Sequence, residues 1–373
     1  MRAVVAAFSL AFAAATPAQI LSDPNLIRTD YLTGLNSPTG LRFFGANEGL
    51  IIEKGGAAKY FSVSSVSTAP NLTVATNSER GLLGIALDPA FATNRQVYLY
   101  QSTGSGSTWI DNRVTRHIWD PVAKTLGSGT LVRAFGSAAN GAPDGPNHNG
   151  GVLTFGPDGK LYGTTGDLNR NGVEQNNRTT TSSAFAGGVF RLNTDGTVPA
   201  DANNKFGGNF APWFTYGVRN SFGLAVDPAT NRIWNTENGD DTFDEINLLS
   251  AGMNSGWRPI QGPRGATDPA AVLNLLPGAQ YVDPKLSFAS AIGITSIQFL
   301  PHDSAIWSAY GNAVLIGEAV NTNRLWLFRL NAARDAFVLE GALADGVVNA
   351  GDVAPFGTGF SVTTDIQVGP DGA

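Results

Sequence analysis

The sequence predicts an all-β fold, and more closely a six-bladed β-propeller. Three observations predict it. Charged residues make up only 14% of the 373 residues, well below the roughly 25% of an average soluble domain, so long salt-bridged surface helices are not expected. Short runs of alternating apolar and polar residues, bounded by Gly, Asn, Asp and Pro, dominate the chain, as in 97–100. A strand-and-turn pattern also recurs along the chain.

Each copy of this repeat is a short apolar strand that ends in a turn containing Pro, Gly or Asp. The turn positions are 45, 89, 157, 228, 301 and 370, so neighbouring copies lie 44, 68, 71, 73 and 69 residues apart. The first copy is degenerate because it ends in Gly45 instead of Pro. The copies are 41–45, 85–89, 153–157, 224–228, 297–301 and 366–370. Six such units are typical of the blades of a propeller.

Several turns lead into a second predicted strand, at 160–162, 232–234 and 305–307. A four-stranded blade needs about 40 residues, so the remaining residues of each repeat are expected in long loops. Two of these loops are 136–147 and 258–284. A pair of β-sandwiches is the alternative, but it would not explain the regular spacing.

The first residues read as a signal peptide. Met1 and Arg2 precede a short run of small apolar residues, and Thr16-Pro17-Ala18 fits a cleavage site. A buried N-terminal helix is the alternative. We therefore expect a signal peptide at 1–18, a single propeller domain at 19–373, and an exported protein, periplasmic or extracellular.

At the other end, the last blade is expected to be incomplete. The printed sequence stops at Gly369–Ala373, a turn signal that elsewhere is followed by a strand. The early segment Leu26–Leu32 alternates in polarity and could supply a strand to this blade. Residues 361–373 are then expected to pack at an unpaired, poorly covered edge.

The charge balance excludes several classes of function. There are 24 Lys and Arg against 30 Asp and Glu, with no basic run, so a nucleic-acid partner is not expected. The chain has no Cys, which excludes disulfides, thiolate metal sites and a Cys nucleophile. No segment reaches 18 consecutive apolar residues, so no membrane span is predicted.

Polar residues recur at one mouth of the predicted propeller channel. Nine residues before each turn position, the innermost strand of a blade is expected to begin. The residues there are Asn36, Arg80, His148, Arg219, Ile292 and Ser361. An imidazole beside two guanidinium groups is a plausible site for an anionic or polyhydroxylated ligand. The alternative is that His148 only hydrogen-bonds loop backbone.

A second candidate site is the oxygen-rich segment Glu237–Glu245. Carboxylates, amides and free carbonyls suit Ca²⁺, which takes 6–8 oxygen ligands. The spacing does not match an EF-hand loop. A solvated acidic turn is the alternative interpretation.

Several stretches of the chain together form a recognisable pattern. They are Pro38–Leu41, Glu79–Ala86, His148–Gly151 with Phe155–Tyr162, Gly217–Asn220 with Gly223–Ala225, and Asp244–Asn247 with Gly256-Trp257. Together they resemble the quinoprotein glucose/sorbosone dehydrogenase family, the soluble aldose sugar dehydrogenases that bind pyrroloquinoline quinone (PQQ) and Ca²⁺, and they follow the family's order from about residue 34 onward. The family's fold is a six-bladed propeller.

The resemblance implies roles for individual residues. His148 matches the general base that takes the proton from the sugar C1 hydroxyl while the C1 hydride moves to PQQ. Arg219 and Asn220 match residues that hold and polarise the reacting quinone oxygens. Gly239 and Asp240 fall where backbone carbonyls bind Ca²⁺, although Asn238 and Asp240 depart from the family's His-Gly-Pro pattern.

Two further residues, Arg80 and Asn147, are predicted to contact the substrate, because they stand beside His148 in the mouth ring and in sequence, respectively. The expected partners are therefore a small-molecule sugar and an electron acceptor that the sequence does not identify.

The chain departs from the family where PQQ carboxylates would bind. The family's Lys of blade five is missing from Gly317–Val320, and both Arg of its Arg-x-Arg-Asp pattern are replaced in Val362–Asp365. Val152 stands in place of the usual Arg after the paired glycines. Losing the Lys and the two Arg of the last two blades, three charge-assisted contacts at about 1.5–3 kcal/mol each, would by itself weaken PQQ binding strongly.

Three functions remain open from the sequence. The first is an exported PQQ- and Ca²⁺-dependent aldose dehydrogenase. The second is a related propeller that has lost PQQ binding and serves as a carbohydrate- or protein-binding module. The third is a hydrolase or lactonase propeller, which the order of the motifs fits poorly.

Overall fold

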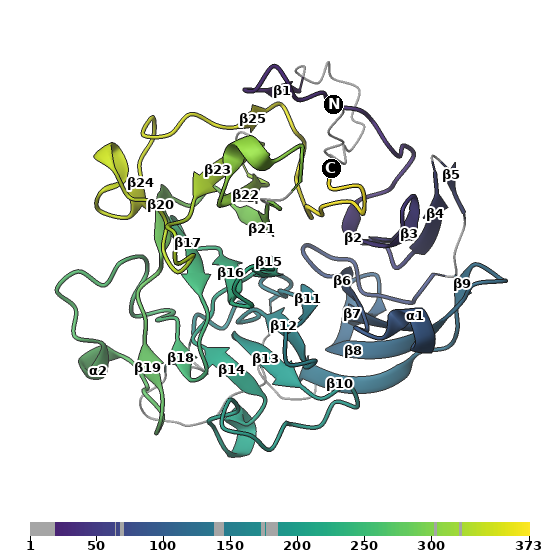
Figure 1. Cartoon of the computed structure of the whole chain (residues 1–373). Helices are drawn as coiled ribbons and strands as arrows, with labels where there is room; N and C mark the ends of the chain where they lie inside the picture. Colours follow the sequence, from purple (N-terminus) through teal and green to yellow (C-terminus); the bar gives the residue numbers. More distant parts are fainter. Residues whose placement is uncertain are drawn as a thin grey trace.

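The structure is a propeller-like arrangement of β-sheets around a common centre, as predicted (Figure 1). In this computed structural model, strands far outnumber helices, and the described α-helices have four residues each. The described residues are 19–63, 65–67, 71–137, 145–172, 176, 186–301, 304–320 and 323–373. The predicted signal peptide, 1–18, lies outside them.

The described strands form five sheets, each built outward from an inner strand. The first sheet is β2 (Pro38–Gly45), β3 (Glu48–Glu53), β4 (Ala58–Ser62) and β5 (Ser65–Val66). The second is β6 (Leu82–Leu87), β7 (Gln96–Ser105), β8 (Thr108–Asp120) and β10 (Thr130–Ser137), with β9 (Thr125–Leu126) on β8. The third is β11 (Leu153–Phe155), β12 (Leu161–Thr165), β13 (Gly188–Leu192), β14 (Trp213–Tyr216), β18 (Met253–Asn254) and β19 (Gln280–Tyr281).

The remaining two sheets complete the described strands. The fourth is β15 (Gly223–Val226), β16 (Ile233–Glu237), β17 (Thr242–Leu248), β20 (Leu286–Ser290) and β24 (Val347–Val348). The fifth is β21 (Ile294–Phe299), β22 (Ala313–Glu318), β23 (Leu325–Arg329), β25 (Gly357–Thr358) and β1 (Ile20–Leu21). The helices are α1 (Phe91–Asn94) and α2 (Pro269–Val272), with 3₁₀ turns at Gly208–Phe210, Ser308–Tyr310 and Gly341–Leu343.

The predicted repeat corresponds to the inner strands. β2, β6, β11, β15 and β21 each overlap one copy of the repeat, and consecutive inner strands contact one another around the centre. The second strands predicted at 160–162 and 232–234 are confirmed as β12 and β16. The one predicted at 305–307 is wrong, because these residues form a turn in which Trp307 is buried, and the second strand is β22.

The predicted sixth blade is not present as a sheet in the described residues. Residues 359–373 contain no strand and run through the gap between the fifth and first sheets (Figure 1). Thr363 N donates to Glu318 O of β22 at 3.4 Å, while Thr364 Oγ1 donates to Pro38 O of β2 at 2.8 Å. This irregular segment therefore joins the two sheets in place of a blade, and its residues 364–369 are half-buried.

The expectation that Leu26–Leu32 forms a strand is wrong. This segment is irregular, and its Tyr31 and Leu32 pack against the buried Phe61 of the first sheet. The N-terminal strand is instead β1, which pairs with β25 on the outside of the fifth sheet. The apolar residues of the alternating pattern are therefore used for side-chain packing, and the segment forms no strand pair.

Among the described helices, none has the length and hydropathy that crossing a membrane requires.

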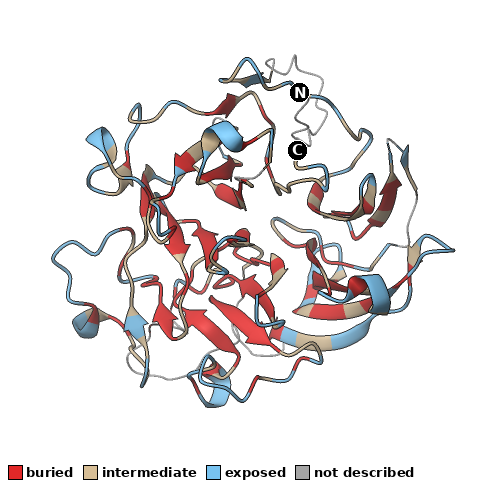
Figure 2. Cartoon of the chain, viewed as in Figure 1, coloured by how far each residue is buried: buried red, intermediate tan, exposed pale blue. Residues whose placement is uncertain are grey.

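Most residues of the inner strands are buried (Figure 2), and aromatic side chains contribute to the packing between neighbouring sheets. Between the fourth and fifth sheets, Trp234 lies 5.7 Å from Phe337 and 6.2 Å from Phe299, measured between ring centroids. The same two sheets are joined by a buried ion pair. Asp227, in the turn after β15, accepts from Arg334 at 2.7 and 2.8 Å, and both side chains are almost fully buried.

We expect Arg334→Met to destabilise the protein by about 3–5 kcal/mol, because it leaves the Asp227 carboxylate buried without its partner. Urea unfolding measures the loss. The matched control is Arg264→Met, which breaks the exposed pair with Asp283 at 3.4 Å and should cost less than about 1 kcal/mol. Equal losses in the two variants would contradict the importance of the buried pair.

Candidate functional site

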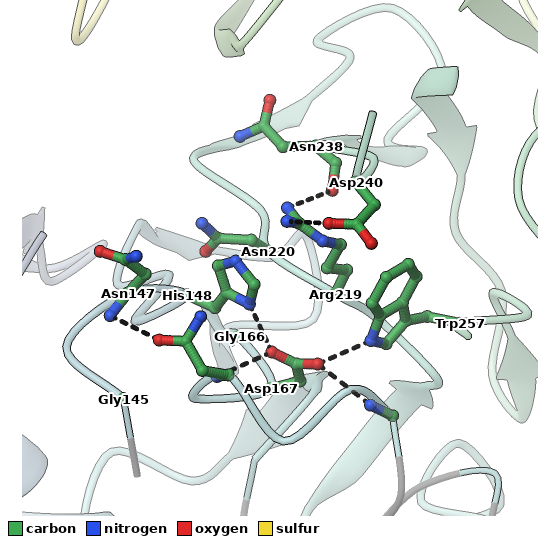
Figure 3. Close-up of polar contacts among 12 residues, drawn as sticks. Gly145, Asn147, His148, Gly166, Asp167, Arg219, Asn220, Asn238, Asp240 and Trp257 are labelled. Atoms are coloured by element: carbon green, nitrogen blue, oxygen red, sulfur yellow. Dashed lines mark hydrogen bonds and ion pairs between the residues drawn. The ribbon is translucent and has the colours of Figure 1, made fainter. Parts of the chain in front are cut away.

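His148 lies in the loop that precedes β11, at one mouth of the central channel, and its side chain is buried. It has a left-handed backbone (φ 60°) and precedes Gly150 and Gly151, which also have positive φ. Its Nδ1 lies 2.6 Å from Oδ1 of Asp167 (Figure 3). Because an ionised carboxylate only accepts, Nδ1 carries the proton and Nε2 has a free lone pair.

Asp167 holds this imidazole in place. It follows β12 by two residues and is fully buried. Besides His148 it accepts from Trp257 Nε1 at 2.6 Å and from the backbone N–H groups of Asn169 and Gly172 at 3.0 Å. With four donors the carboxylate cannot rotate freely, so the orientation of His148 is fixed.

Nε2 of His148 faces away from Asp167, on the side where Asn220 and Arg219 lie (Figure 3). Within the described part of the chain this nitrogen has no hydrogen-bond partner. The imidazole is therefore positioned to accept a proton from a bound molecule. The alternative, that the His148 side chain only hydrogen-bonds loop backbone, is wrong, because the ring is bonded to the Asp167 carboxylate.

Glu79 connects loops of three sheets at this mouth. The sequence did not lead to its prediction as a site residue. It lies in the loop before β6, and its Oε2 accepts from His148 N at 2.6 Å and from Asn220 Nδ2 at 3.1 Å. Asn220 in turn accepts from Gly150 N at 3.1 Å. The sequence signal that could have identified Glu79 was its position next to Arg80, one of the six residues predicted to surround the mouth of the channel.

Arg219 lies in the loop between β14 and β15 and contacts the acidic segment. Nη2 donates to Asp240 Oδ1 at 3.0 Å, Nη1 donates to Asn238 O at 3.3 Å, and the guanidinium lies 5.2 Å from the Trp257 ring centroid. Its carbonyl accepts from Asp167 N at 2.8 Å. Arg219 is therefore held on the same rim as His148 and Asn220.

The other two predicted substrate contacts lie close to the rim. The guanidinium of Arg80 is 4.4 Å from the Trp109 ring centroid, and its Nη2 donates to Gly145 O at 3.0 Å. Arg80 is thus buried under the His148 loop. The Asn147 side chain contacts Ser78. Contact of either residue with a substrate stays a prediction.

The two ends of the acidic segment are buried, whereas its turn, residues 240–242, is exposed. Glu237 on β16 and Glu245 on β17 lie directly opposite each other, and both are almost fully buried. Burial raises the pKa of Glu237 to about 7, and burial together with Glu237 raises the pKa of Glu245. Glu237 accepts from Arg219 N at 2.7 Å, so it positions the Arg219 backbone.

The predicted Ca²⁺ ligands, Gly239 and Asp240, lie at the exposed end of this segment. The Asp240 carboxylate is shared by Arg219 at 3.0 Å and Arg258 at 3.5 Å. Gly239 N donates to Asp244 Oδ1 at 2.9 Å. Since Asp240 is already paired with two cations, the oxygen atoms left for a metal ion here include backbone carbonyls and the buried Asn238 Oδ1, which has no hydrogen-bond partner among the described residues. Ca²⁺ at this position stays a prediction.

A central cavity of about 300 Å³ opens beside Glu79 and runs between the inner strands. A second cavity of about 210 Å³ continues toward the other face of the sheets. Arg42, Val152, Phe222 and Asp365 line both cavities. Arg42 Nη1 donates to Asp365 Oδ2 at 2.8 Å, so this ion pair lies between the two cavities.

The lining of the central cavity does not fit a tricarboxylate such as PQQ. The stretches expected to carry PQQ-binding cations do reach the cavity, but with neutral side chains: Val152, Ala319, Val362 and Thr364. Its described lining has two cations, Arg42 and Lys54, and two carboxylates, Glu79 and Asp365. These charges cancel, so three further carboxylates would be left largely uncompensated.

Comparison with known proteins gives the family. Residues 35–351 match the family model described as Glucose / Sorbosone dehydrogenase. The chain is 30% identical over 289 residues to an uncharacterised protein of Synechocystis, covering 73% of this chain and 68% of that protein. It is 31% identical over 220 residues to quinoprotein glucose dehydrogenase B of Acinetobacter calcoaceticus, covering 54% of this chain but only 44% of that enzyme.

Among solved structures, the PQQ-bound aldose sugar dehydrogenase of Streptomyces coelicolor is similar. It superposes with a TM-score of 0.66 at 27% identity, covering 87% of this chain and 84% of that one. The matched region contains the inner strands, the His148 loop and the Arg219 loop. The chain therefore belongs to the glucose/sorbosone dehydrogenase family.

Proposed function

We propose that the protein is a sugar dehydrogenase-like oxidoreductase that acts on the C1 hydroxyl of an aldose. The observation that carries this proposal is the pair of His148 and Asp167, with Nδ1 bound to a buried carboxylate and Nε2 without a hydrogen-bond partner among the described residues. The names of relatives, an aldose sugar dehydrogenase and a glucose dehydrogenase, support the substrate class.

In this proposal His148 Nε2 accepts the proton of the sugar hydroxyl. Asp167 stabilises the imidazolium that forms and keeps the correct tautomer before the reaction. As the hydroxyl loses its proton, C1 can release its hydrogen with the bonding electron pair to a two-electron acceptor. Asn220 and Arg219, on the same rim, are placed to donate to oxygens that gain negative charge.

The sequence resemblance implies PQQ and Ca²⁺ as cofactors, and the similar aldose sugar dehydrogenase of Streptomyces coelicolor was solved in a PQQ-bound form. Because the neutral lining of the central cavity does not fit three carboxylates, we assign no step of this reaction to PQQ. We also propose that residues 1–18 are a signal peptide and that 19–373 form one domain of an exported protein.

The second candidate is a non-catalytic carbohydrate- or protein-binding propeller that has lost PQQ binding. The cancelled charges of the central cavity favour it, since they remove contacts on which the family's cofactor depends. The two candidates differ in whether His148 takes part in turnover.

We expect His148→Gln to lower kcat by about 10²–10⁴-fold, the usual contribution of a general base. Dye reduction with several aldoses, in the presence of Ca²⁺ and either PQQ or 1,4-naphthoquinone, measures it. His117→Gln is the matched control, because His117 bonds Thr115 and Gly127 O on the second sheet, away from the rim. Full activity of His148→Gln would refute the base, and an inactive wild type would favour the binding module.

We expect Asp167→Asn to lower kcat by about 10²–10⁴-fold with little change in KM, because the amide can donate to Nδ1 and stabilise the wrong tautomer. Trp257→Phe is the control, since it removes one donor to Asp167 but leaves the carboxylate and should cost much less. Circular dichroism checks folding. A raised KM at unchanged kcat would contradict a role of Asp167 in orienting the base.

A further inference from the structure

The two cations that line the central cavity differ in what they contact. Arg42 is used inside the protein: Nη1 bonds Asp365 at 2.8 Å and Leu41 O at 2.6 Å, and Nη2 bonds Leu153 O at 3.2 Å. Its charge is neutralised by Asp365. Arg42 therefore closes the floor of the cavity and has no charge to offer a ligand.

Lys54 is in a different situation. It follows β3 and lines the cavity near its mouth, beside Ser78 and Glu79. Its Nζ donates to the backbone carbonyl of Thr76 at 2.7 Å, and among the described residues no carboxylate pairs with it. Glu79 is the nearest acid in the lining, but its Oε2 already accepts from His148 N and Asn220 Nδ2.

The half-buried position of Lys54 has an electrostatic consequence. Desolvation lowers the pKa of its ammonium group, with Glu79 acting in the opposite direction. Nζ has no direct carboxylate partner among the described residues, so a carboxylate bound against it would be held by a charge-assisted hydrogen bond. No second unpaired cation lines the cavity among the described residues.

Most of the remaining side chains of the wall are apolar, and the polar ones are the hydroxyl groups of Thr39, Ser78, Thr295 and Thr364. Leu83, Ile85, Val152, Phe222, Ala319 and Val362 line the cavity. Such a surface suits the flat apolar body of a ligand, whereas a second or third carboxylate against it would lose its hydration without a partner.

We propose that the central cavity binds an aromatic or quinone monocarboxylate, and that Lys54 binds its single carboxylate. This proposal rests on the proposed function, because the cavity reaches Glu79, whose carboxylate accepts from the His148 backbone, and it replaces the family's tricarboxylate by a monoanion. Lys54 is then the residue that sets the specificity of this site.

Isothermal titration calorimetry of the full chain tests the proposal without requiring turnover. The probes are 1,4-naphthoquinone-2-carboxylate, uncharged 1,4-naphthoquinone, and PQQ. The wild type should bind the monocarboxylate at least tenfold more tightly than the uncharged quinone, and no less tightly than PQQ. In Lys54→Met the advantage of the carboxylate should disappear, while the affinity for uncharged naphthoquinone should stay unchanged.

Lys160→Met is the matched control, because Lys160 bonds Asn193 outside the cavity and should leave all three affinities unchanged. If Lys54→Met does not fold, Lys54→Gln is used in its place. Tighter binding of PQQ than of the monocarboxylate, an unchanged preference in the Lys54 variant, or no binding of the monocarboxylate at millimolar concentration would each overturn the proposal.

A gain-of-binding variant gives an independent measurement. Ala319→Lys combined with Val362→Arg places two cations on the neutral wall, and PQQ affinity should rise at least tenfold. An unchanged PQQ affinity would contradict the view that missing cations exclude the tricarboxylate. Failure of the dehydrogenase assay would not affect these readouts, so the binding proposal and the proposed function can fail separately.

Discussion

The buried carboxylate of Asp167 is the interaction on which the site depends. It accepts from His148, Trp257 and two backbone N–H groups, and its own N–H donates to the Arg219 carbonyl. One group therefore fixes the ring of the proposed base and the start of the Arg219 loop. Glu79 acts in the same way on the other side, since it joins the His148 backbone to Asn220. These two carboxylates align residues from three sheets, which no single loop could do.

The same principle explains how the sheets are joined around the centre. Asp227 pairs with Arg334 between the fourth and fifth sheets, and Asp365 joins the irregular segment 359–373 to Leu41 N and Arg42 of the first sheet. Where a sixth sheet was predicted, polar side chains of this segment make the contacts that strand pairing makes elsewhere. The side of the mouth that holds His148 and Asn220 can therefore keep its geometry, while the side formed by the segment 359–373 lacks the cations that the family resemblance leads us to expect.

Short sequence patterns predicted those strands and turns that are determined by a few consecutive residues. The strand-and-turn repeat located β6, β11, β15 and β21, because alternation and a Pro or Gly turn are short-range signals. The same signals failed at 305–307 and at Leu26–Leu32, where apolar side chains pack without strand pairing. His148, Arg219 and Asn220 could be identified from motifs, whereas Asp167 and Glu79 could not. Their partners lie far along the chain or in other sheets, and although Glu79 begins the stretch Glu79–Ala86, nothing in that stretch shows that its carboxylate joins His148 to Asn220.

The ion pair of Arg42 and Asp365 divides the centre of the molecule. Together with Val152 and Phe222 it lies where the cavity beside Glu79 meets the one that continues toward the opposite face. Because each charge of the pair already has its partner, the pair forms a neutral partition between the two cavities. A molecule bound in the first cavity is therefore in contact with the wall lined by Lys54 and Glu79, apart from the second cavity.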